Sequence, residues 1–440
     1  MKKQISVGLA MLMAVSVTAC GGGGKADPGS ADAGNSMEGT SGGGNVKQIV
    51  LWGPSSEPAV ETWWTETIQA FNEQYAGQYE LSRESIVRSN SYAYEDKINS
   101  AITSNDLPDI LMLDGPNVAS YAENGIIIPL DDYVAQEDKD DLVASSLEQN
   151  TYNNILYAMS NTESSVALFY NKDMVEAAGI QIPEKLEDAW TWSEFREVAK
   201  KLTTDEVAGT NIILDKGEGI PYVMEQFWIS NGTDFTNPEG TKADGYLNSE
   251  KGVEAAGFLN ALIQDGLANI EPIPKEFHNG KAATALTGCW EVKTLNSEYP
   301  DLNWGVTYFP VADDGTPASP TGDWTMTITK DSEDPAAAAI ALNFLTSKEN
   351  AATYADAQGK PPARKSSYDV LTQYDEMPMA IFKEQLLSTG HARPRTPSYT
   401  VLSPQISEAM MNIFTGADIK ESLDKAAEAF DEDYEKNYAR

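Results

Sequence analysis

Residues 107–131 read LPDILMLDGPNVASYAENGIIIPLD, a strand pattern followed at once by a helix pattern. The apolar run at 109–113 predicts a short buried strand, and 117–123 predicts a helix that stops at Gly125. Upstream, 49–52 and 79–87 predict two more strands, each followed by apolar residues at helical spacing. Strands that alternate with helices over short links indicate an α/β sheet.

The second half of the chain is richer in helix patterns. Thr191-Trp192-Ser193-Glu194 fits a capping box that opens a helix over 193–202. Apolar spacing predicts a helix over 250–265 that ends at Gly266, and Asp334-Pro335 predicts the start of another. The spacing of apolar residues over 419–430 predicts a last helix.

The composition limits the classes of function. A chain of 440 residues with 41% hydrophobic residues is long enough for two or three domains. Its formal net charge of -36 makes nucleic acid a poor partner, because phosphate binding needs clustered Lys and Arg. With only two cysteines and two histidines, His278 and His391, we expect no metal site and no cofactor.

The N-terminus predicts export. Lys2 and Lys3 precede an apolar run over 5–17, which as a helix spans about 20 Å, less than the hydrocarbon core of a bilayer. Val17-Thr18-Ala19-Cys20 resembles the lipobox of bacterial lipoproteins, which predicts a signal peptide at 1–19 and a lipid on Cys20. Ten glycines within 21–45 predict a flexible tether, so that 20–46 links the lipid to the folded part. A lipidated Cys20 would leave Cys289 unpaired, as a small buried hydrophobe.

Several sequence blocks in order resemble the bacterial extracellular solute-binding proteins of ABC importers, the family of sugar and maltodextrin binders. One block, which resembles part of the first of the family's two lobes, comprises Leu107-Pro108-Asp109-Ile110 and 124–131. Others are Tyr170-Asn171-Lys172-Asp173-Met174, the 277–290 segment that ends in Gly288-Cys289-Trp290, and Gly359-Lys360-Pro361-Pro362. The chain departs from the family pattern at Cys289, where proline is frequent, and at 158–161, where the hinge often reads Pro-Tyr.

The resemblance implies a two-lobed periplasmic-binding-protein-like fold of type II, α/β in class. One lobe would comprise 47–158 plus 322–361, and the other 159–321 plus 362–440. A ligand would lie in the cleft between lobes joined by a hinge, and closure would trap it. The implied partner is an ABC permease. The implied location is the extracytoplasmic face of the cell membrane of a bacterium, Gram-positive in type, with the protein a lipid-anchored monomer.

A sugar site needs flat aromatic side chains for the C–H faces and planar polar groups for the hydroxyls. Trp63 and Trp64 lie on a predicted helix and are expected to pack there. Arg393 is expected to pair with structural acids rather than with ligand. The candidate ligand-binding residues are Trp52, Asp114, Asn161, Glu163, Trp228, Trp290, Asp323, Trp324 and Arg395.

The predicted function is capture of a carbohydrate, most simply an oligosaccharide, for an importer. A binder of another solute, such as a peptide, a polyamine or a polyol phosphate, remains open. A lipid-anchored glycoside hydrolase also remains open, but with 67 acidic residues any candidate carboxylate pair is uninformative. No Gly-x-Ser-x-Gly, His-Glu-x-x-His or phosphate loop occurs, so we expect no catalytic residues.

Overall fold

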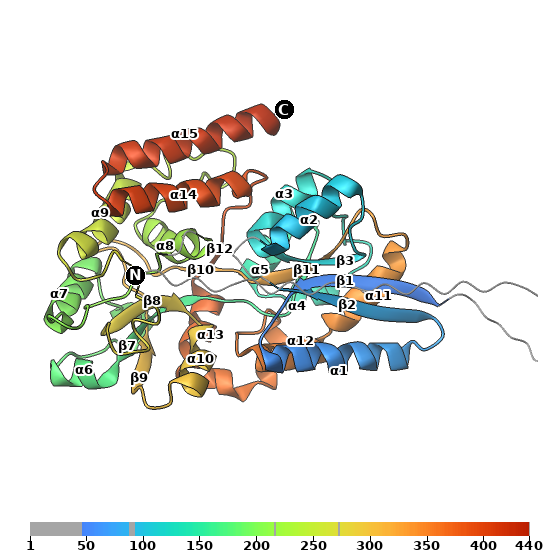
Figure 1. Ribbon diagram of the computed structural model, residues 1–440, viewed down its shortest axis with the longest axis horizontal. Helices are drawn as coiled ribbons and strands as arrows, with labels where there is room; N and C mark the ends of the chain where they lie inside the picture. The colour runs from blue at the N-terminus through green and yellow to red at the C-terminus, as the bar shows by residue number, and fades with distance from the viewer. Residues whose placement is uncertain (1–45, 88–92, 215–216, 272, 440) are drawn as a thin grey trace, which may run out of the picture. The chain divides into compact units, whose positions relative to one another are not determined.

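The computed structural model describes residues 46–87, 93–214, 217–271 and 273–439 (Figure 1). The predicted signal peptide, the predicted lipidation site at Cys20 and the glycines of the predicted tether lie outside the described residues. No described helix is both long and apolar enough to cross a membrane.

A five-stranded mixed sheet organises one part of the chain. Its strand order is β2-β1-β3-β11-β6, with β1 parallel to β2 and β3, and β11 antiparallel to β3 and β6. The strands are β1 (Lys47–Pro54), β2 (Tyr79–Ile86), β3 (Ile110–Asp114), β6 (Met159–Ser160) and β11 (Trp324–Ile328). The three strands predicted over 49–52, 79–87 and 109–113 are therefore confirmed, and they lie in one sheet.

Both faces of this sheet are covered, as Figure 1 shows with α1 and α12 below it and α2 and α3 above. Ile110 and Met112 of β3 pack in one hydrophobic cluster, whereas Leu111 and Leu113 pack in another. A strand buried on both faces reads as a continuous apolar run, which explains the ILML sequence. The covering helices are α1 (Pro58–Gln74), α2 (Ala93–Ser104), α3 (Val118–Glu123), α11 (Pro335–Leu345) and α12 (Lys348–Gln358).

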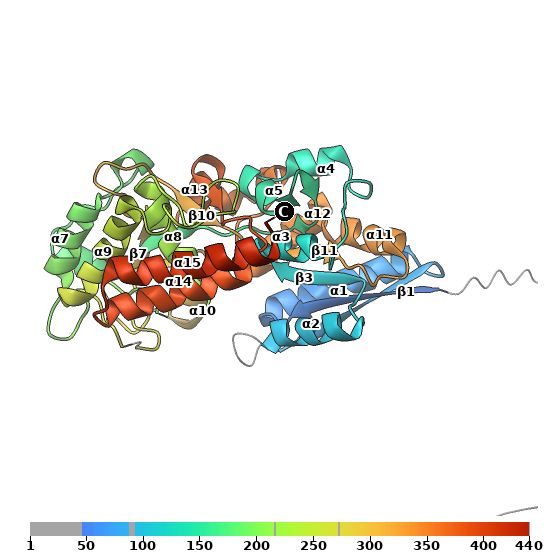
Figure 2. The same cartoon turned by 90° about the horizontal axis from the view of Figure 1, so that it is seen from above.

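A second sheet organises the other part. Its order is β8-β7-β9, all antiparallel, with strands β7 (Val166–Asn171), β8 (Thr284–Gly288) and β9 (Trp304–Thr307). Val166 and Leu168 of β7 pack in one cluster, and Ala167 and Phe169 in another. Figures 1 and 2 both show the last two helices side by side beside this part. The helices around this sheet are α7 (Trp192–Leu202), α8 (Gly219–Ser230), α9 (Glu250–Gln264), α10 (Glu291–Glu298), α13 (Met379–Ser388), α14 (Tyr399–Phe414) and α15 (Ile419–Asn437).

We call the part around the five-stranded sheet the first lobe and the part around the three-stranded sheet the second lobe. Three chain segments cross between them. Glu163 N donates to Pro361 O at 2.8 Å, and Ala363 N donates to Asn161 O at 3.0 Å. An isolated bridge joins Ser165 to Thr321. The predicted lobe boundaries fall at these crossing segments and stay predictions.

Smaller elements complete the described chain. They are α4 (Gln136–Asp141), α5 (Ala144–Gln149), α6 (Lys172–Ala177), β4 (Thr151–Tyr152), β5 (Ile155–Leu156), β10 (Ser319–Thr321), β12 (Gly390–Ala392) and four short 3₁₀ turns at Gly115–Asn117, Leu186–Asp188, Lys365–Asp369 and Thr372–Asp375.

Local helix signals match their predictions. The Thr191 side chain accepts from Glu194 N while the Glu194 carboxylate accepts from Thr191 N, so the predicted capping box is formed. Helix α11 begins at Pro335, with the Asp334 side chain accepting from Ala337 N. Gly266 has a φ of 71° just after α9, a conformation that favours glycine at a helix end.

Candidate functional site

A cavity of about 760 Å³ lies between the two lobes, and we call it the cleft cavity. The first lobe lines it with the turn after β1, Met112, Trp324 and the end of α12. The second lobe lines it with Trp290 and α10. The polar and aromatic lining residues are Ser55, Ser56, Glu57, Lys275, Trp290, Glu291, Lys293, Thr294, Ser297, Glu298, Trp324, Tyr354, Gln358 and Lys360.

Trp290 reaches the cleft cavity because of a glycine two residues earlier. A Cβ on Gly288 would lie 2.1 Å from a ring carbon of Trp290, so only glycine permits the indole to lie against the end of β8. The indole also packs on Tyr222, with ring centroids 5.8 Å apart. Trp290 is therefore held in place while remaining partly exposed to the cavity.

Trp324 approaches the same cavity from the first lobe. It begins β11, opposite Asp114 in the β3 ladder. Its ring meets Tyr94 edge to face at 5.6 Å, and it is partly exposed. The fold thus brings together two of the predicted tryptophans, one from each lobe, at one cavity.

A buried ion pair joins Lys360, which lines the cleft cavity, to Asp323. Lys360 Nζ is 2.8 Å from Asp323 Oδ1, and Thr162 Oγ1 donates to Asp323 Oδ2 at 2.7 Å. Burial disfavours the Lys360 ammonium, but the attraction of Asp323 outweighs it, so the pKa of Lys360 is raised. Lys360 consequently stays charged and supplies N–H donors beside the cavity, while Asp323 is only 5% exposed.

A second polar network joins the lobes around Arg393. Its Nη2 lies 2.9 Å from Asp114 Oδ1 and its Nη1 lies 2.6 Å from Glu218 Oε1. The guanidinium also stacks 4.6 Å from the ring centroid of Tyr222. Burial raises the pKa of the Glu218 carboxyl, the Arg393 charge opposes this, and the net direction is upward. Arg393 pairs with acids as predicted. Because it also stacks on Tyr222, it links that ring to the ion pair between Arg393 and Asp114 that joins the lobes.

Two predicted residues lie in the crossing segments. Glu163 is fully buried, and neither carboxylate oxygen makes a hydrogen bond of ordinary geometry. Burial, reinforced by Asp323, raises the pKa of Glu163 to about 8. Asn161 is also buried, and its Nδ2 donates to Leu345 O at 3.1 Å.

The remaining predicted residues lie apart from the cleft cavity. Trp52 is partly exposed on β1 and lies under Lys97, whose Nζ is 4.1 Å from the ring centroid. Trp228 is fully buried in the second-lobe core and donates from Nε1 to Leu247 O at 2.9 Å. Arg395 pairs with Glu148 at 2.9 Å at another cavity. None of these three therefore lines the cleft cavity, although Trp52 packs against the same hydrophobic cluster as Trp324.

Sequence reasoning missed Glu218, Tyr222 and Lys360, which shape the site. Glu218 and Tyr222 are four apart at the start of α8, and Glu225 is three further on, so they share a face of an otherwise apolar helix. These polar side chains on one face of an apolar helix were the feature of the sequence that could have indicated the site. Lys360 stands in the Gly-Lys-Pro-Pro block that carried the resemblance, but nothing local marked it as a cavity residue.

The described ranges hold neither a cluster of metal-ligating side chains nor an exposed thiol. No group of three or more His, Cys, Asp or Glu side chains there is arranged to hold a metal ion. Cys289 is unpaired and buried, and burial raises the pKa of its thiol to about 12. Its predicted packing role is confirmed.

Residues 66–379 match the pattern of the bacterial extracellular solute-binding proteins. The chain belongs to this family. A putative binding protein of Brucella abortus is 24% identical over 342 residues, 76% of this chain and 81% of that protein. The galactooligosaccharide-binding protein of Bacillus subtilis is 23% identical over 332 residues, 73% of this chain and 76% of the relative. The sn-glycerol-3-phosphate-binding periplasmic protein of Escherichia coli is 26% identical over 288 residues, 60% of this chain and 64% of that protein.

Solved structures of similar proteins share the fold of this solute-binding protein. The cyclic alpha-maltosyl-1,6-maltose binding protein of Arthrobacter globiformis has a TM-score of 0.76 at 20% identity, covering 89% of this chain and 100% of the other. An ABC transporter solute-binding protein of Thermotoga lettingae bound to alpha-D-tagatose also has a TM-score of 0.76, at 22% identity, with 88% and 100% covered. The predicted two-lobed α/β fold is confirmed.

Proposed function

We propose that this solute-binding protein captures an oligosaccharide in the cleft cavity and delivers it to the permease of an ABC importer. The observation that carries the proposal is the placement of Trp290 and Trp324, from different lobes, at one cavity between them. A relative binds galactooligosaccharides by name, and similar structures are named for cyclic maltosides or hold a sugar.

The lining of the cleft cavity suits a sugar. Indole faces cover the apolar C–H surface of a pyranose, while hydroxyls need both donors and acceptors. Lys360 and Lys293 donate, Glu57 and Glu291 accept, and Gln358 does both. A sugar that touches both lobes binds the closed arrangement more tightly than an open one, so binding itself favours closure.

The location and the other partners are also proposals. The signal peptide, lipidated Cys20 and tether would hold a monomeric binding protein at the extracytoplasmic face of a Gram-positive membrane. Replacement of Cys20 with serine should then move the protein from the membrane fraction to the medium. No catalytic step is proposed, because closure and release suffice for delivery.

A polyol phosphate is the second candidate ligand. The glycerol-3-phosphate-binding relative and three lysines at the cleft cavity, Lys275, Lys293 and Lys360, favour it. However, Lys360 is already paired with Asp323, and Glu57, Glu291 and Glu298 line the same cavity. A dianionic phosphate would face these carboxylates, so we favour the uncharged sugar.

A thermal-shift panel tests the proposal. Maltotriose, galactotriose, maltose, glycerol 3-phosphate, spermidine and a tripeptide are each added at millimolar concentration. A ligand at 100 times its Kd stabilises the folded state by about 2.7 kcal/mol, which raises the Tm by a few degrees. We expect an oligosaccharide to raise the Tm. A rise with glycerol 3-phosphate, spermidine or the peptide alone would overturn the sugar assignment.

A further inference from the structure

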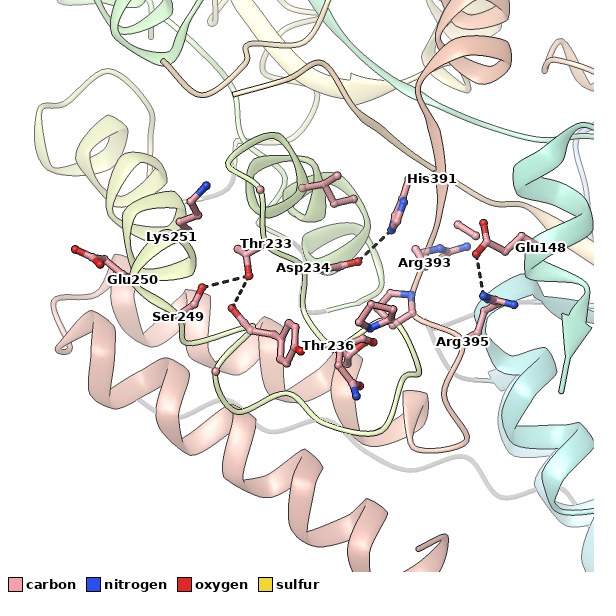
Figure 3. A pocket seen from close by; sticks show the side chains of 18 residues that line it. Glu148, Thr233, Asp234, Thr236, Ser249, Glu250, Lys251, His391, Arg393 and Arg395 are labelled. Atoms are coloured by element: carbon pink, nitrogen blue, oxygen red, sulfur yellow. Dashed lines mark hydrogen bonds and ion pairs between the residues drawn. The ribbon is translucent and has the colours of Figure 1, made fainter. Parts of the chain in front are cut away.

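A second cavity, of about 720 Å³, lies beside residues 391–395 (Figure 3). Its volume is within the usual range of small-molecule sites. It shares no lining residue with the cleft cavity. We call it the side cavity.

The side cavity has walls from both lobes. Glu148 lies on α5, and the preceding residue, Leu147, packs against the first-lobe core. The opposite wall comes from residues 232–251 and from the 391–395 segment, and Figure 3 labels Thr233, Thr236 and Ser249 on the first of these stretches. One ion pair spans the gap, with Arg395 Nη2 at 2.9 Å from Glu148 Oε1. An occupant that contacts Glu148 and Arg395 therefore touches both lobes.

The charged groups at the 391–395 end of the side cavity are already paired, which favours an uncharged ligand there, while Glu250 and Lys251 line the other end. His391 Nε2 lies 3.0 Å from Asp234 Oδ2, and Arg395 is paired with Glu148. At that end an anionic ligand would have to displace a carboxylate from His391 or from Arg395. A hydroxyl group donates and accepts at once, so it can bridge a carboxylate and its cation without breaking either charge balance.

Other parts of the wall fit the rest of a sugar. Tyr246, Pro238 and Pro394 supply flat apolar surface for C–H groups. The Asn237 and Thr236 side chains add polar groups, and both also form hydrogen bonds within their own loop. The wall thus combines apolar surface with paired polar groups, as a polyhydroxylated ligand requires.

A buried donor at the side cavity has no partner. Arg393 lines the cavity, its side chain is 3% exposed, and its Nε makes no hydrogen bond. An unpaired buried N–H is unfavourable, so a ligand oxygen that reached it would be stabilised by the hydrogen bond. Arg393 also stacks on Tyr222, which packs against Trp290 of the cleft cavity. The two cavities are therefore separated by a short chain of packed side chains.

We propose that the side cavity is a second carbohydrate site, distinct from the cleft cavity. The proposal rests on the sugar-binding function proposed above and adds a separate position for a sugar. A sugar held there contacts both lobes through Glu148 and Arg395, so it stabilises the closed arrangement from a second side.

The test is calorimetric titration of the full chain with maltotriose and with galactotriose, with tryptophan fluorescence followed in parallel. The side cavity has no tryptophan in its lining, so fluorescence reports the cleft cavity and calorimetry reports both. We expect two sugars per chain in the wild type. Arg395→Gln and Tyr246→Ala should each weaken the second binding event at least tenfold, whereas Trp290→Ala should weaken the first.

Arg196→Gln is the matched control, because Arg196 pairs with Asp265 on the exposed surface of the second lobe. One sugar per chain, with both side-cavity variants equal to Arg196→Gln, would overturn this inference and leave the proposed function standing. No binding of either sugar at any site would contradict both.

Discussion

Arg393 of the second lobe lies 2.9 Å from Asp114 of the first lobe, and this contact joins the lobes at the end of β3. The same guanidinium reaches Glu218 and stacks on Tyr222. One buried cation therefore neutralises a carboxylate from each lobe. The lobe contact is electrostatic at its centre and aromatic at the cleft cavity, where Trp290 packs on Tyr222.

Arg393→Gln should destabilise the protein strongly. It leaves Glu218 and Asp114 without their cation, and breaking a buried pair from one side costs about 3–5 kcal/mol. Asp114→Asn should cost less, because the Asp114 side chain is 24% exposed and water can replace part of the contact. Urea unfolding at pH 7 measures both, with Arg196→Gln as an exposed-pair control at about 0–1 kcal/mol. Equal losses for Arg393→Gln and Arg196→Gln would contradict this role.

Trp290→Ala and Trp324→Ala should each weaken oligosaccharide binding at least tenfold, which corresponds to about 1.4 kcal/mol. Each variant removes one apolar face from the cleft cavity. Trp304→Ala is the matched control, since Trp304 is also partly exposed but stacks on Phe169 and does not line the cavity. Isothermal titration of the folded variants gives the affinities. Unchanged affinity in both cleft variants would rule out this cavity as the sugar site.

Glu163 should make stability depend on pH. Burial raises the pKa of its carboxyl from 4.5 to about 8 in the folded protein. Between these values the unfolded chain has lost the proton and the folded chain retains it, so stability falls as pH rises from about 4.5 to about 8 and then levels off. At about 1.4 kcal/mol per pKa unit, the effect has an upper bound of about 5 kcal/mol.

Urea unfolding at pH 5, 7 and 9 measures this dependence. Glu163→Gln keeps the shape of the side chain but has no carboxyl group to ionise. The fall in the free energy of unfolding between pH 5 and pH 9 should therefore be much smaller in this variant. A decline of the same size in wild type and Glu163→Gln would show that other groups cause it.

Cys289 should be inert in the folded protein. Its thiol is buried, and burial raises its pKa to about 12, so little thiolate forms at pH 8. A Cys20→Ala chain should therefore give no thiol reaction with an aromatic disulfide reagent until urea unfolds it, and then one thiol per chain. Rapid reaction of the native protein would place Cys289 at an accessible surface instead.

The fold was predictable where local signals agree with packing. The apolar runs of β1 and β3, the capping box at Thr191 and Pro335 at the start of α11 each carry their information within a few residues. The order of the strands was not predicted, because β11, which pairs with β3 in the sheet, lies more than 200 residues later in the chain.

The site was predictable only in part. Trp290 and Trp324 follow turns at strand ends, where side chains reach a cavity edge. Trp228 lies on α8, which is apolar on nearly all sides, so its burial is decided by α9 and α14 packing around it. The Arg393 network joins residues 114, 218 and 393, and no local pattern encodes such a meeting.

A crystal structure of the protein grown with the oligosaccharide that raises its Tm most tests the central claim directly. The account predicts a sugar ring against the indole of Trp290 or Trp324, with hydroxyls bonded to residues of both lobes. Density for the sugar only outside the cleft cavity, with both indoles uncovered, would contradict it.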